Sequence, residues 1–274
     1  MNAAGYLLFA GADEVVALEC GKVRISYGEL RVAVRRAAGA WRARGLGQGE
    51  RVLVFAPDGI EWVIAYLGAI WAGGVAVGLN SRLFEKDLRV VLNESGARFI
   101  WCSAGSQALL GGLLAGAAEA PTIVIDSDWA TGLGEASQIL AHDQPEDAPA
   151  LWIYTSGTTG IPKAVVHAQR CVLDAGTFAR EVLGLGPGDR IYATSKLFFA
   201  YALGNNLFGG LIEIAVFAVA TPGREQEADL SLCAGIEALP KIKRPRLVKW
   251  VQELPLTATG KLQRRKLKDL ILSA

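Results

Sequence analysis

The chain has 274 residues, of which 51% are hydrophobic and 20% are charged, and its formal net charge is +1. This length can bury a substantial core in one or two domains, while the near-neutral charge argues against binding to nucleic acid or to anionic membranes. The four cysteines are widely scattered and the two histidines stand far apart, which argues against a disulfide framework and a histidine-based metal site. We therefore expect reduced thiols and a cytoplasmic location.

The N-terminal half alternates predicted helices with predicted strands. Ser26 and Glu29 form a capping-box pattern, which predicts a helix that ends near Gly45. The apolar face of this helix is Leu30, Val34, Ala37, Ala38 and Trp41. Strands are expected at residues 51–56, 75–77, 98–102 and 122–126, and helices at residues 62–71 and near residues 108–118. This alternation predicts an α/β fold with a mostly parallel sheet layered with helices.

Residues 62–79 carry no charge and are long enough for a membrane helix. Glycines interrupt this run at Gly68, Gly73, Gly74 and Gly78. A buried helix that ends near Gly73, followed by a strand, explains the pattern better than a membrane span. No secretory signal is expected, because residues 1–5 lack a basic region.

A candidate phosphate-binding loop is the strongest functional signal in the chain. Residues 154–163 read YTSGTTGIPK, and Gly157 and Gly160 allow the backbone to approach an anion closely. Hydroxyl and backbone N–H groups between them can form an anion-binding nest, and Lys163 adds a positive charge. Apolar strands are predicted before the loop at residues 150–154 and after it at residues 164–168. The pattern differs from the common P-loop, and a flexible Ser/Thr/Gly loop is the alternative on composition alone.

The character of the sequence changes after Ile212. A strand at residues 213–220, a helix at 225–239 and a strand at 246–251 predict a small α+β unit. Basic clusters follow at residues 241–246 and 261–268. A solvated surface is the favoured explanation of such clusters.

Three segments resemble signatures of one superfamily. The loop and its following strand, YTSGTTGIPKAVVH, resemble the phosphate-binding signature of adenylate-forming enzymes, which include acyl-CoA synthetases, luciferases and peptide-synthetase adenylation domains. Residues 253–264, ELPLTATGKLQR, are similar to the C-terminal catalytic-lysine motif of that superfamily. Residues 196–205, KLFFAYALGN, are similar to the acid-pocket segment of benzoate-type CoA ligases. The chain therefore resembles an aromatic acid–CoA ligase of the benzoate type.

This resemblance implies a reaction and the residues that carry it. An aromatic carboxylate attacks the α-phosphate of ATP, and the CoA thiol then displaces AMP from the acyl-adenylate. ATP, CoA and magnesium are the implied cofactors. Lys261 would be the catalytic lysine of the adenylation step. The implied phosphate-binding residues are Thr155, Ser156, Gly157, Thr158, Thr159, Gly160 and Lys163. The implied acid-pocket residues are Phe199, Ala200, Tyr201 and Gly204, for which a plain apolar core is the alternative.

The resemblance covers nearly the whole chain, but as two pieces joined near Gly210. Residues 1–210 resemble part of an N-terminal adenylating domain, and residues 211–274 resemble part of the C-terminal domain with the lysine motif. We find no counterpart of the adenine-pocket, ribose-binding and magnesium-associated motifs between them. We therefore expect impaired ligase activity and self-association through uncovered apolar surface. The alternative is a non-catalytic remnant that binds phosphate, a nucleotide or a protein.

Overall fold

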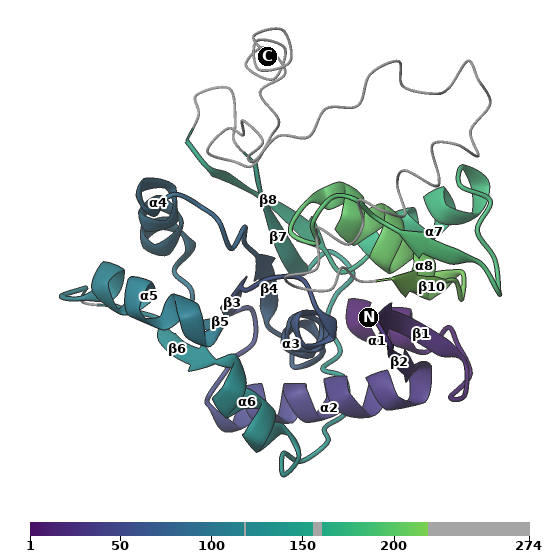
Figure 1. The fold of residues 1–274 in the computed structure, drawn as a ribbon, viewed down its shortest axis with the longest axis horizontal. Helices are drawn as coiled ribbons and strands as arrows, with labels where there is room; N and C mark the ends of the chain where they lie inside the picture. Colours follow the sequence, from purple (N-terminus) through teal and green to yellow (C-terminus); the bar gives the residue numbers. More distant parts are fainter. Residues whose placement is uncertain (118, 156–160, 219–274) are drawn as a thin grey trace, which may run out of the picture.

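The computed structural model describes residues 1–117, 119–155 and 161–218, which form two sheets with helices around them (Figure 1). The larger sheet has the order β6-β5-β3-β4-β7-β8 and the smaller has the order β2-β1-β10-β9. The strands of the larger sheet are β3 (Arg51–Phe55), β4 (Val75–Gly78), β5 (Phe99–Cys102), β6 (Thr122–Ile125), β7 (Pro149–Thr155) and β8 (Lys163–Ala168). The strands of the smaller sheet are β1 (Val16–Cys20), β2 (Val23–Ser26), β9 (Arg190–Tyr192) and β10 (Val216–Ala218).

The larger sheet is parallel except at one edge, as the alternation of helices and strands predicted. Strands β6, β5, β3, β4 and β7 run in the same direction, and β8 returns antiparallel to β7. The β7–β8 pairing ends with Thr155 opposite Lys163. The strands predicted on both sides of the phosphate loop are therefore confirmed as one hairpin.

Helices cover both faces of this sheet. The α-helices are α1 (Ala3–Leu8), α2 (Tyr27–Ala43), α3 (Ile60–Trp71), α4 (Glu85–Ser95), α5 (Gln107–Leu114), α6 (Asp126–Leu133), α7 (Cys171–Glu181) and α8 (Gly209–Ile212). A 3₁₀ turn η1 (Ala104–Ser106) and a π-helix η2 (Tyr201–Phe208) complete the described helical elements. Helices α2 and α3 lie on one face, and α4 and α5 lie on the other.

Alternation along the strands divides the interior into two cores. Val52 and Val54 of β3 belong to the core under α2 and α3, whereas Leu53 and Phe55 belong to the core under α4 and α5. Each of these side chains is at most 1% exposed. Strand β3 is apolar at successive positions because both of its faces are buried.

Local signals located several helix boundaries correctly. Ser26 accepts a hydrogen bond from the Glu29 N–H, and the Glu29 carboxylate accepts one from the Ser26 N–H, so the predicted capping box is present at the start of α2. The helix predicted near residues 108–118 is shorter and begins at Gln107. None of the helices that the structure describes is long and apolar enough to cross a membrane, and the uncharged run 62–79 forms α3 and β4.

The described part of the C-terminal segment packs in the smaller sheet. Strand β10 lies between β1 and β9 and is parallel to both. Its start differs from the predicted strand at residues 213–220, because Glu213 and Ala215 still donate backbone hydrogen bonds to the carbonyls of Gly209 and Gly210, the first two residues of α8. The helix and strand predicted at 225–239 and 246–251 lie outside the described residues, and the predicted domain boundary at residue 210 stays a prediction.

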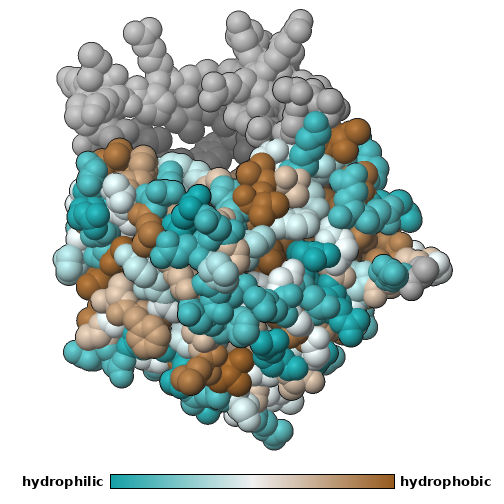
Figure 2. Space-filling model, turned by 180° about the vertical axis from the view of Figure 1, so that it is seen from behind, coloured by the Kyte–Doolittle hydropathy of each residue, from teal (hydrophilic) through white to brown (hydrophobic). Residues whose placement is uncertain are grey.

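Hydrophobic and hydrophilic side chains are interspersed on the face of the molecule shown in Figure 2. Apolar exposure is high along the hairpin edge, where Ile161 is 52%, Val165 is 43% and Val166 is 53% exposed. These residues stand on or next to β8, the edge strand of the larger sheet. Exposed sheet edges can pair with another chain, so the expected self-association stays a prediction tied to this edge.

Candidate functional site

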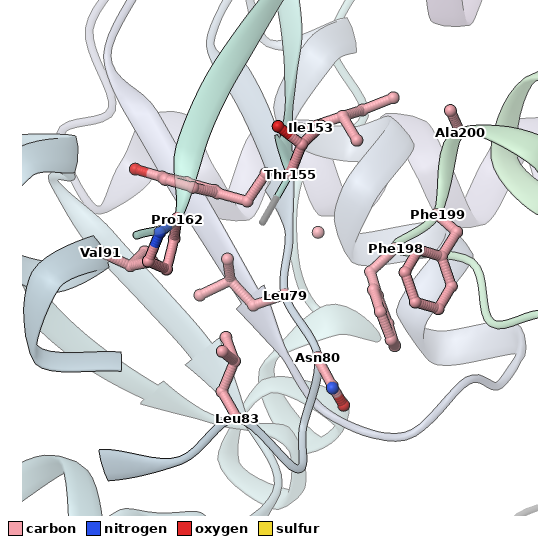
Figure 3. A pocket seen from close by; sticks show the side chains of 12 residues that line it. Leu79, Asn80, Leu83, Val91, Ile153, Thr155, Pro162, Phe198, Phe199 and Ala200 are labelled. Atoms are coloured by element: carbon pink, nitrogen blue, oxygen red, sulfur yellow. The ribbon is translucent and has the colours of Figure 1, made fainter. Parts of the chain in front are cut away.

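A pocket opens at the carboxyl ends of the parallel strands β4 and β7. It encloses about 170 Å³ and lies where many α/β proteins bind their ligands (Figure 3). Its lining residues come from separate parts of the chain: Gly78, Leu79, Asn80, Leu83, Val91, Ile153, Tyr154, Thr155, Pro162, Phe198, Phe199 and Ala200.

The pocket walls are mainly apolar and include two aromatic rings. Phe198 and Phe199 lie in the segment between β9 and η2, and their ring centroids are 4.3 Å apart with an interplanar angle of 44°. Both rings lie on one side of the pocket, across from Leu79 and Ile153 (Figure 3). Apolar walls with a few polar groups are typical of sites that bind a flat organic ligand.

The two ends of the predicted phosphate loop meet this pocket. Thr155 at the end of β7 and Pro162 immediately before β8 both line it. Their strands are paired up to Thr155 and Lys163, so the loop between them must start and finish beside the pocket. Lys163 is exposed. The predicted residues Ser156, Gly157, Thr158, Thr159 and Gly160 lie outside the described residues, as does Lys261.

The predicted acid-pocket residues divide into two groups. Phe199 and Ala200 line the pocket, whereas Tyr201 and Gly204 do not. The π-helix η2 begins at Tyr201, whose side chain is 55% exposed. Outside its own helix backbone, no described atom lies within 4 Å of a Cβ atom added to Gly204, so a side chain would have room there.

The sequence reasoning missed the part of the pocket formed by residues that follow β4. Leu79 and Asn80 continue directly from that strand, and Leu83 and Val91 lie before and within α4. The Asn80 side-chain oxygen accepts a hydrogen bond of 2.9 Å from the Arg82 N–H. A signal was present, because residues that follow a buried parallel strand lie at the ligand-binding edge of such a sheet.

Burial keeps two side chains of the β7–β8 hairpin neutral at physiological pH. Burial, assisted by the negative charge of Glu94, raises the pKa of Tyr154 to about 12, so its phenol keeps its proton. Burial lowers the pKa of His167 on β8, which favours the uncharged imidazole. Among the described residues, no group of three or more His, Cys, Asp or Glu side chains could hold a metal ion.

Comparisons with known proteins identify the family of this chain. A family profile described as AMP-binding enzyme matches residues 10–239. The 3-hydroxybenzoate–CoA/4-hydroxybenzoate–CoA ligase of Thauera aromatica is 38% identical over 237 residues, which are 81% of this chain and 45% of that protein. The 3-hydroxybenzoate–CoA ligase of Aromatoleum sp. (strain CIB) is 41% identical over 227 residues, which are 77% of this chain and 43% of that protein.

Solved structures share the same fold. A benzoate CoA ligase from Burkholderia xenovorans LB400 superposes with a TM-score of 0.75 and 27% identity, over 85% of this chain and 48% of that one. The anthranilate CoA ligase AuaEII, solved in complex with anthranoyl-AMP, superposes with a TM-score of 0.78 and 25% identity, over 85% of this chain and 47% of that one. The matched part of the chain therefore covers less than half the length of these relatives.

Proposed function

This chain belongs to the AMP-binding enzyme family, and we propose that it binds an aromatic carboxylate beside the phosphates of ATP, as part of an aromatic acid–CoA ligase. One observation carries the proposal. Thr155 and Pro162, at the two ends of the phosphate loop, line the same pocket as Phe198 and Phe199. A ring held by the aromatic side chains would direct its carboxylate toward a phosphate held by the loop.

The proposed chemistry has two steps, both of which develop negative charge on oxygen. The acid carboxylate attacks the α-phosphate of ATP and releases pyrophosphate, and the CoA thiolate then attacks the acyl carbon and releases AMP. Loop N–H and hydroxyl groups at residues 155–160, together with Lys163, would stabilise the phosphate charge, and Lys261 would act during adenylation. Magnesium would enter with the ATP phosphates.

We further propose that turnover by this chain is weak. Its matched residues cover only 45% and 43% of two such relatives, and the sequence offers no counterpart of their superfamily's adenine- and ribose-binding motifs. Each missing polar contact costs about 1–3 kcal/mol, so the loss of several should weaken ATP binding by orders of magnitude. The second candidate function is therefore binding without catalysis.

The test combines calorimetry with an assay of pyrophosphate release. The purified chain should bind benzoate and 3-hydroxybenzoate more tightly than octanoate, with little acid-dependent AMP formation. A preference for octanoate would overturn the aromatic assignment. Rapid acid-dependent and CoA-dependent AMP formation would overturn the proposal of weak turnover.

A matched pair of lysine variants tests the phosphate side. Lys163→Ala should weaken the binding of ATP and of pyrophosphate alike, because the phosphates are the part of ATP that the chain holds. Lys86→Ala removes another exposed lysine, on α4, and should leave both affinities unchanged. Binding of adenosine as tightly as ATP would contradict phosphate recognition.

We also propose a cytoplasmic location and a tendency to self-associate. The exposed Val165 and Val166 on the edge strand β8 support the second point. Light scattering of the wild-type chain and of a Val166→Lys variant would test it, since a charge on the edge should reduce association. A monomeric wild-type chain with one sharp unfolding transition would contradict it.

A further inference from the structure

A buried carboxylate ties the aromatic segment of the pocket to the larger sheet. Asp58 lies in the loop that follows β3, and it is only 7% exposed. Its Oδ2 atom accepts a hydrogen bond of 3.1 Å from the backbone N–H of Leu197, which lies 139 residues further along the chain. Asp58 does not itself line the pocket.

This hydrogen bond holds the residue immediately before the aromatic pair. Leu197 is 1% exposed and packs in the core under α2 and α3. The next three residues, 198–200, all line the pocket. The Phe199 N–H donates to the carbonyl of Lys196 over 3.0 Å, which closes a turn at this point. The position of the Leu197 backbone therefore sets the position of the turn, and the turn places the rings of Phe198 and Phe199.

The same segment is pressed against β4 from the other side. A Cβ atom added to Gly78 would lie 3.3 Å from the Cα atom of Phe198 and 2.9 Å from a ring carbon of Trp62. The backbone at Phe198 thus approaches the end of β4 as closely as a glycine permits. Residues 197 and 198 are therefore held on two sides, by the hydrogen bond to Asp58 in the β3–α3 loop and by the close contact with Gly78 at the end of β4.

The cost of burying Asp58 points to a specific role. Burial raises the pKa of its carboxyl group, while the Leu197 N–H and the positive charge of Lys196 oppose that rise. A buried carboxylate is costly unless hydrogen bonds compensate it. Here the compensating hydrogen bond comes from the backbone of a loop, not from a helix or a strand. The bond therefore stabilises the conformation of that loop.

We propose that Asp58 is a positioning residue for the aromatic acid. By holding Leu197, it keeps Phe198 and Phe199 in the orientation that leaves the pocket open to a flat ring. The inference rests on the proposed function, because it names the residue that shapes the acid-binding side of that same site.

The test uses two variants of Asp58 in the full chain. In Asp58→Ala, the affinity for 3-hydroxybenzoate should fall about tenfold, because one hydrogen bond to a charged group is lost. Asp58→Asn should restore most of that affinity, since its amide oxygen can still accept from Leu197. Pyrophosphate affinity should stay unchanged in both variants, because the phosphate loop does not depend on this bond.

Gln169→Ala is the matched control for a loss of stability alone. Gln169 is fully buried, its Oε1 atom accepts a 2.8 Å hydrogen bond from the Ala3 N–H, and its Nε2 atom donates to the Pro149 carbonyl at the opposite end of β7. This variant should unfold more easily than the wild type, yet bind 3-hydroxybenzoate with wild-type affinity.

Hydrogen–deuterium exchange tests the hydrogen bond between Asp58 and the Leu197 N–H directly. The Leu197 amide should exchange faster in Asp58→Ala than in the wild type, and slowly again in Asp58→Asn. Unchanged exchange in Asp58→Ala overturns the inference, as does unchanged acid affinity or an equal loss of acid and pyrophosphate affinity. If wild type binds the acid, these results leave the proposed function intact. If wild type binds pyrophosphate but neither benzoate nor 3-hydroxybenzoate, the proposed function and the inference both fail.

Discussion

The pocket has one wall made of strand ends and another made of a loop, and different interactions hold the two. The strand wall is Gly78, Leu79, Ile153 and Thr155, and the loop wall is Phe198, Phe199 and Ala200. Gly78 pairs with both Val54 and Ile153 in the sheet, and the Leu79 N–H donates to the Val54 carbonyl over 3.0 Å. The loop wall depends on Asp58 and on turn hydrogen bonds at its own ends.

Because the two walls are held differently, we expect the strand wall to govern the stability of the fold and the loop wall to govern ligand affinity. Leu79 is 1% and Ile153 is 8% exposed, so changes in the strand wall disturb the packed core. Phe198 and Phe199 are half-buried, and Ala200 is exposed. Changes that act on the loop wall should therefore alter ligand affinity more than the free energy of unfolding.

The largest expected effect comes from the strand wall. Leu79→Ala should lower the free energy of unfolding by about 2–5 kcal/mol, because it leaves a cavity in the core under α4 and α5. Urea denaturation measures this loss. Leu83→Ala is the control, since Leu83 lines the same pocket but is only partly buried, and it should lose less. Equal losses of unfolding free energy in the two variants would show that Leu79 contributes no more to stability than the partly buried Leu83.

Gly78→Ala acts where the two walls meet. The added methyl group would collide with the Trp62 ring and crowd the Phe198 backbone, at a cost of about 1–3 kcal/mol in the free energy of unfolding. The loop wall should move to relieve the collision, so the affinity for 3-hydroxybenzoate should fall as well. Calorimetry and urea denaturation together would check this, and an unchanged acid affinity would show that the walls are not coupled.

Asp58→Asn should change how stability depends on pH. Burial raises the pKa of Asp58 above its ordinary value of 3.8, so the folded chain holds this proton more tightly than the unfolded chain. Its contribution to stability is full below the unfolded pKa and is lost as the pH rises through the folded pKa. The wild-type free energy of unfolding minus that of Asp58→Asn should therefore decrease as the pH rises from 3.8.

Urea denaturation of the wild type and of Asp58→Asn, at a series of pH values from 3.8 upward, measures this difference in the free energy of unfolding. An increase with pH would mean that the Leu197 N–H and Lys196 stabilise the carboxylate more than burial destabilises it.

The smallest effect is expected outside both walls. Arg89 and Glu85 form an exposed i,i+4 ion pair of 2.9 Å on α4. Arg89→Ala should change the free energy of unfolding by no more than about 0.5 kcal/mol, because solvent screens the pair. This variant gives the baseline against which losses in the two walls are judged. A loss above 1 kcal/mol would indicate that α4 contributes more than an exposed helix surface should.

Helix α4 was not predicted although part of its signal was present. Helix α4 has buried residues at Leu88, Val91, Leu92 and Ser95, which is a helical spacing. Strand β10 was expected to start earlier, but the turn at the end of α8 takes up the first residues. Strand β10 lies between β9 and β1, and its Phe217 pairs with Leu18, almost 200 residues away. Local propensity carries no information on such a partner.

The sequence by itself determined the local features: the capping box of α2, the doubly buried strands and the hairpin around the phosphate loop. These follow from residues that are neighbours in the chain, because side-chain spacing and capping hydrogen bonds act over a few positions. Only the tertiary structure decided that Thr155, Pro162 and Phe199 share a pocket, and that Asp58 holds Leu197. The sheet order brings these distant segments together, and a pairing across 139 residues leaves no local pattern.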